Sequence, residues 1–126
     1  MTGKLLLLEQ TREDTQKWKR LLDCLQQNNI VQKYHLAELL KQYQGKDDFV
    51  PLAEHYQNRF LQQDEALKLM RNDVAILEEL CITNQRDQIY HRKKKFEKEL
   101  RVLRANFKQI SSEFAIFVLS AASLCV

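Results

Sequence analysis

Apolar residues recur at alternating intervals of three and four positions through the second half of the chain. Over residues 53–84 they occupy the a and d positions of a heptad repeat, in which only Gln63 and Asn84 are polar. A second run with the same alternation covers residues 96–124, but its phase is displaced relative to the first. Sustained heptads are typical of long helices of the coiled-coil type. We therefore predict a long heptad-bearing helix over residues 52–113.

The phase change falls in a polar stretch, residues 83–88. No glycine or proline interrupts the chain between Leu52 and Ser112, and nothing there is expected to end a helix. A discontinuity of this kind locally over-winds or under-winds a supercoil, or marks a flexible joint. The predicted helix is about 60 residues long, which corresponds to roughly 90 Å.

A shorter helix is predicted before it, from about Thr11 to residue 44. Apolar residues again recur at intervals of three and four, and the stretch up to Tyr43 contains no glycine or proline. The adjacent Asn28 and Asn29 interrupt the apolar pattern. They predict either a local kink or a polar layer in the core.

The break between the two helices covers residues 45–51. Gly45 can adopt the left-handed conformation that follows a helix end. Asp47 or Asp48 can accept hydrogen bonds from the free N–H groups of the next first turn. Pro51 fits that first turn because it has no N–H to leave unpaired.

The predicted fold is all-α, with two helices over about residues 11–44 and 50–120, arranged as a hairpin or extended. The chain divides into an N-terminal helix, a break, a long heptad-bearing helix and an apolar C-terminal tail, which are residues 1–44, 45–51, 52–113 and 114–126. Even in a hairpin, the first helix would cover only about half the length of the second. We therefore expect an outside partner to cover the apolar stripe beyond Gln88.

The apolar heptad positions are predicted to form a contact seam with that partner, either a second copy or another coiled-coil protein. The contact seam consists of Phe60, Leu67, Met70, Val74, Leu77, Leu100, Leu103, Phe107 and Ile110. Glutamate in place of Leu100 and Leu103 is expected to abolish association, because it would bury unpaired charges.

Composition supports helix and indicates no catalytic chemistry. The chain has only two glycines and one proline, fewer than the turns of a β or α/β domain need. The three histidines (His35, His55 and His91) stand without a cysteine or carboxylate at ligand or triad spacing. We expect a non-enzymatic protein with no cofactor and no metal. The three cysteines are far apart, which favours reduced thiols in a cytosolic or nuclear compartment. Of the two, we expect the cytoplasm rather than the nucleus.

Positive charge is concentrated in one region. Between Arg86 and Lys108 lie nine Lys or Arg against three acids. The predicted basic patch comprises Arg92, Lys93, Lys94, Lys95, Lys98, Arg101 and Arg104. We favour a solvated helix face, since consecutive residues fan out around a helix. The alternatives are an acidic partner such as a microtubule or anionic lipid, and nuclear import with nucleic-acid binding.

The tail, residues 114–126, is apolar on every side. It is shorter than the roughly 20 residues that span a bilayer. Three alternatives remain open for it: docking into a partner, contact with a membrane interface, or the boundary of a splice form or fragment of a longer protein.

The heptads over residues 53–124, the Gln/Glu/Lys-rich flanks and the single break resemble the long eukaryotic coiled-coil proteins that build centrosomes, cilia and vesicle tethers. The resemblance implies a cytoplasmic scaffold or adaptor in a cytoskeletal assembly. A membrane-associated tether, using the tail and the basic patch, is the alternative. Nuclear nucleic-acid binding is the weaker one.

Overall fold

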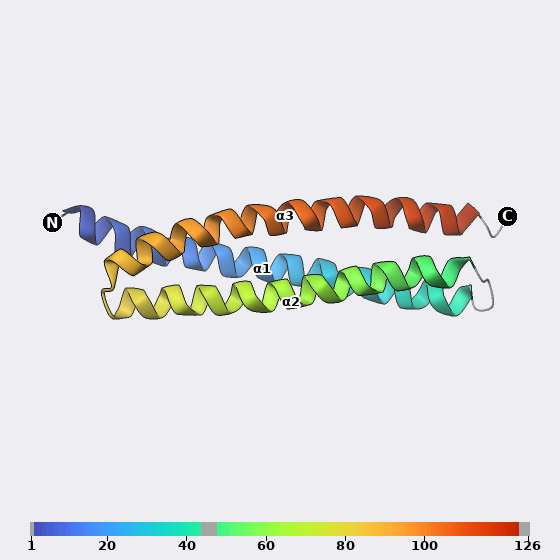
Figure 1. Ribbon diagram of the computed structural model, residues 1–126, viewed down its shortest axis with the longest axis horizontal. Helices are drawn as coiled ribbons and strands as arrows, with labels where there is room; N and C mark the ends of the chain where they lie inside the picture. Colours follow the sequence, from blue (N-terminus) through green and yellow to red (C-terminus); the bar gives the residue numbers. More distant parts are fainter. Residues whose placement is uncertain (1, 44–47, 124–126) are drawn as a thin grey trace.

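The computed structural model describes residues 2–43 and 48–123, and all regular secondary structure in them is helical. Three helices follow one another: α1 (Thr2–Gln42), α2 (Phe49–Ile82) and α3 (Arg86–Ser123). They run up, down and up along one axis, so that the described ends of the chain lie at opposite ends of the molecule (Figure 1). The all-α prediction is confirmed.

The prediction of two helices is wrong, because the long helix expected over residues 52–113 is interrupted by a turn at Thr83–Gln85. The Gln85 amide donates to the Leu80 carbonyl at 3.0 Å, and the Asn84 amide donates to the Cys81 carbonyl at 3.4 Å. Asn84 itself has φ of 56°. This is a Schellman closure, in which one left-handed residue satisfies the last carbonyls of a helix. The phase change in the heptads is therefore a reversal of the chain.

Replacement of Asn84 tests this turn. Asn84→Gly is expected to raise the free energy of unfolding by about 0.5–1 kcal/mol, because glycine adopts positive φ without a steric cost. Asn84→Val is expected to lower it by about 1–2 kcal/mol, because a β-branched side chain is strained there. Urea unfolding followed by circular dichroism measures both. Equal stability of the two variants would contradict a left-handed residue at this position.

The first break differs in detail from the prediction. Gly45 and Asp47 lie outside the described residues. Asp48 precedes α2, but its side chain makes no capping hydrogen bond, so capping by Asp48 is wrong. Pro51 lies in the first turn, as expected. At the other end, α1 begins at Thr2 and not near residue 11, because the early leucines belong to the helix.

The three helices bury the heptad positions against one another. All nine residues of the contact seam are buried within the chain. Seven of them, from Leu67 to Leu77 on α2 and from Leu100 to Phe107 on α3, belong to a cluster that also contains Leu22 of α1. The other two, Phe60 and Ile110, belong to a cluster that contains Leu36 of α1. The apolar stripe beyond Gln88 is thus covered by α1 and α2. The helix lengths therefore do not require an outside partner there, because α2 and α3 are separate helices of similar length.

The first part of the apolar tail is the last part of α3. Phe114, Phe117 and Ala121 are buried, and the Tyr43 hydroxyl donates to the Ala121 carbonyl at 2.6 Å. Residues 124–126 lie outside the described part. Within the described ranges, no helix has the length and apolar character needed to cross a membrane.

Candidate protein-interaction surface

The residues of the basic patch point in different directions from α3. Lys93 turns toward α1, where its ammonium lies 2.7 Å from the Asp14 carboxylate. The Lys95 ammonium lies 3.9 Å from Glu99 on the same helix, and that of Lys94 lies 4.7 Å from the centre of the Tyr90 ring. Consecutive residues of a helix are about 100° apart, so the run 92–95 forms no single surface.

Part of the patch does line up, together with residues that the sequence reading left out. These residues are all exposed and follow one another at intervals of three or four, which places them on one side of α3. We call them the basic stripe: Lys94, Lys98, Arg101, Ala105, Lys108, Ser112, Ile116 and Leu119. Ile116 is 65% exposed and Leu119 is 71% exposed. The stripe is therefore basic in its first half and apolar toward its end.

A groove between α1 and α3 adjoins the basic stripe and has a volume of about 500 Å³. Toward one end of the helices Lys93 pairs with Asp14, and toward the other the Gln32 amide donates to the Ser111 hydroxyl at 2.9 Å. The groove is lined between them by Leu21, Leu25, Asn28, Arg104, Ala105, Phe107, Lys108, Ser111 and Ser112. Every charged residue among these is basic. The groove thus combines an apolar wall with positive charge.

The opposite charge gathers on α2. Its outward side carries a second row at intervals of three or four, which we call the acidic stripe: Glu54, Asn58, Leu61, Glu65, Leu69, Asn72, Ile76 and Glu79. Leu61 is 51% exposed and Leu69 is 64% exposed, whereas Ile76 is half-buried. The sequence alone does not distinguish this row, because the apolar positions that form the core give a stronger pattern on the same helix.

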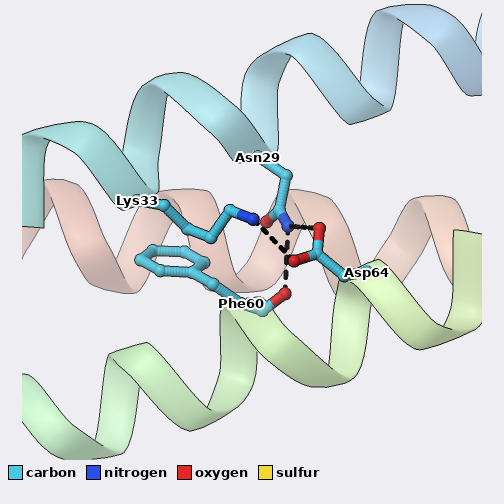
Figure 2. Close-up of polar contacts among 4 residues, drawn as sticks. All are labelled: Asn29, Lys33, Phe60 and Asp64. Carbon is cyan, nitrogen blue, oxygen red and sulfur yellow. Dashed lines mark hydrogen bonds and ion pairs between the residues drawn. The ribbon is translucent and has the colours of Figure 1, made fainter.

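A polar layer joins α1 to α2 in the middle of the bundle (Figure 2). The side-chain amide of Asn29, which is fully buried, donates to the Phe60 carbonyl at 3.0 Å and to Asp64 Oδ1 at 2.7 Å. The Lys33 ammonium lies 2.6 Å from Asp64 Oδ2. Of the two alternatives for the asparagine pair, the structure contains the polar layer. Asn28 is exposed and lines the groove.

Asp14 couples the first half of α1 to α3. Burial raises the pKa of Asp14, but the Lys93 ammonium and the Gln10 amide outweigh that effect, and the pKa lies below its ordinary value. A carboxylate with a depressed pKa stabilises the fold above its unfolded pKa of about 3.9, and the contribution is lost as the pH falls through the folded pKa.

Asp14→Asn is accordingly expected to lower the free energy of unfolding by roughly 1.5 kcal/mol at pH 7, the range for a charge-assisted hydrogen bond. Below the folded pKa the parent loses this contribution, so the two proteins should converge in stability as the pH falls below about 4. Urea unfolding over a pH series measures the difference. A difference that persists unchanged at pH 3 would contradict the assignment.

The histidines and cysteines occupy separate places. His35 meets the edge of Phe114, with ring centres 5.8 Å apart. Cys24 is exposed, whereas Cys81 is buried, and burial raises the pKa of the Cys81 thiol. Cys125 lies outside the described residues. Within residues 2–43 and 48–123, no three His, Cys, Asp or Glu side chains are grouped so that they could hold a metal ion.

No protein-family model matches the chain, and searches of curated proteins and of solved structures found no match. The surfaces of the bundle are therefore the basis for a functional proposal.

Proposed function

We propose that this chain is a non-enzymatic helical scaffold that binds a helix of another protein molecule along the outer side of α3. The observation that carries the proposal is the basic stripe together with the adjoining groove. Leu21 and Leu25 are half-buried beside that groove, and Arg104 and Lys108 at its edge are exposed. A fourth helix in this place would convert the three-helix bundle into a four-helix one.

The chemistry of the surface defines the partner. An apolar wall beside positive charge suits an amphipathic helix that carries acidic side chains next to its apolar face. Such pairing is of the coiled-coil type, with apolar contacts at the centre and ion pairs at the edges. A cytoplasmic cytoskeletal assembly supplies partners of this kind, and a reducing compartment suits the exposed thiol of Cys24.

Two synthetic peptides of about 25 residues, the length of the basic stripe, test the proposal. Both carry leucine at a and d positions, and one has glutamate and the other lysine at the flanking positions. The intact chain is expected to bind the glutamate peptide at micromolar concentrations, and the affinity should fall as salt is added. No binding of the lysine peptide is expected. Fluorescence anisotropy measures both.

Arg104→Glu with Lys108→Glu is the informative variant, since both side chains are exposed and removing them leaves the core intact. This variant is expected not to bind the glutamate peptide, while its helical content stays the same as that of the parent. The proposal is wrong if neither peptide binds and the chain instead co-floats with anionic vesicles or binds nucleic acid. In that case the basic stripe would be a membrane-binding or polyanion-binding surface.

A further inference from the structure

We infer that the partner on α3 is a second copy of this chain, which docks through the acidic stripe of its α2. The inference rests on the proposed function and specifies the partner. Within the acidic stripe the charged residues are Glu54, Glu65 and Glu79, and within the basic stripe they are Lys94, Lys98, Arg101 and Lys108. Acidic residues of one stripe can therefore meet basic residues of the other, which favours this pairing over docking of two like stripes.

The neighbouring charges leave this complementarity in place. Lys68 precedes Leu69 of the acidic stripe and is exposed, and it lines a pocket between α1 and α2 together with Lys33 and Asp64. Glu97 is exposed and adjoins the basic stripe, three residues after Lys94 and four before Arg101, so it is a single acid among four basic residues. Within the described residues, none of Glu65, Glu79, Lys94 and Lys108 forms an ion pair inside the chain. They are available to a second molecule.

The two stripes also match in length and order. Each extends over about 25 residues, or roughly 38 Å of helix. In an antiparallel alignment of the full stripes, Glu79 lies opposite Lys94 and Glu65 lies opposite Lys108. The same alignment places Leu69 opposite Ala105, so that the large exposed side chain of one stripe meets a small one of the other. Ion pairs thus flank an apolar contact near the middle.

The contact is head-to-tail. The acidic stripe lies on α2 and the basic stripe on α3, each on the solvent-facing side of its helix, and α2 and α3 are separate helices of the bundle (Figure 1). A copy bound through one stripe therefore keeps its other stripe free for a third molecule. Such heterologous contacts generate rings or open chains rather than isolated dimers.

Charge reversal in two variants tests the inference. Glu65→Lys with Glu79→Lys places two lysines opposite Lys108 and Lys94, and Lys94→Glu with Lys108→Glu places two glutamates opposite Glu79 and Glu65. Each variant alone is expected to associate about tenfold or more weakly than the parent, because two ion pairs become repulsions. An equal mixture of the two is expected to associate again, since every contact between unlike copies is complementary. Sedimentation velocity across a concentration series measures the three samples.

Two control variants separate the effect of charge within the stripes from the effect of the net charge of the chain. Glu9→Lys with Glu13→Lys, and Lys17→Glu with Arg20→Glu, change the net charge equally at exposed sites of α1. These variants should associate like the parent, and circular dichroism should show that all variants remain helical. A parent that stays monomeric throughout, or a mixture that does not regain association, overturns the inference. Binding of the glutamate peptide by that monomer would leave the proposed function standing, so the two failures are distinguishable.

Discussion

A chain carrying Leu100→Glu and Leu103→Glu is expected to unfold, and not merely to stop associating. Leu100 is 7% exposed and Leu103 is 6% exposed, and both pack in the cluster that contains Leu22 and Leu67. Each buried carboxylate costs several kcal/mol unless it is paired. The total stability of a domain is only about 5–15 kcal/mol. Far-UV circular dichroism at 25 °C should show the loss of most helical signal.

The same helix provides the control. Val102→Glu with Asn106→Glu adds the same two charges at exposed positions and should change stability by less than about 1 kcal/mol. If Leu100 and Leu103 faced a partner molecule instead, their replacement would leave a helical monomer. A helical, cooperatively melting double variant would therefore contradict the three-helix core.

The apolar periodicity predicted which residues are buried, but it could not say what buries them. A heptad stripe requires a complementary helix face, and the requirement is met equally by a second molecule or by the chain turning back. The heptad pattern predicts that Phe60, Leu100 and Phe107 face another helix, and all three lie inside the bundle. The deciding feature is the turn at Asn84, which provides the complementary face within one chain.

That turn was hidden because its signal is weak in sequence. No glycine or proline lies between Ile82 and Arg86, and a polar gap in heptads occurs in uninterrupted coiled coils as well. An asparagine is one of the few residues other than glycine that adopts positive φ at low cost. Asn84 between polar neighbours was therefore the available indication of a helix end.

Surface chemistry was less predictable than the core. The run Arg92–Lys95 is prominent in sequence, yet Lys93 forms an ion pair with Asp14 and does not contribute to an outward basic surface. The acidic stripe on α2 has the same spacing as the core positions but is offset around the helix. Its significance depends on which side faces water, and that follows only from the packing of α1 and α3 against α2.

Asn29→Ala is expected to lower the free energy of unfolding by about 2–3 kcal/mol. The substitution removes the donor to the Phe60 carbonyl and to Asp64 Oδ1. It leaves part of the Asp64 carboxylate without its buried partner, and an unsatisfied group costs about 1–3 kcal/mol. It also opens space in a fully buried position, which adds a packing penalty. Urea unfolding at neutral pH measures the change.

The neighbouring asparagine is a matched control. Asn28 has the same side chain in the same turn of α1 but is exposed, so Asn28→Ala should alter stability by less than about 0.5 kcal/mol. Asn29→Leu separates packing from hydrogen bonding, since it fills the space but provides no donor. Asn29→Leu is expected to be more stable than Asn29→Ala, because it restores part of the packing, but less stable than the parent, because Asp64 remains incompletely paired. Equal effects at positions 28 and 29 would show that the polar layer does not stabilise the pairing of α1 with α2.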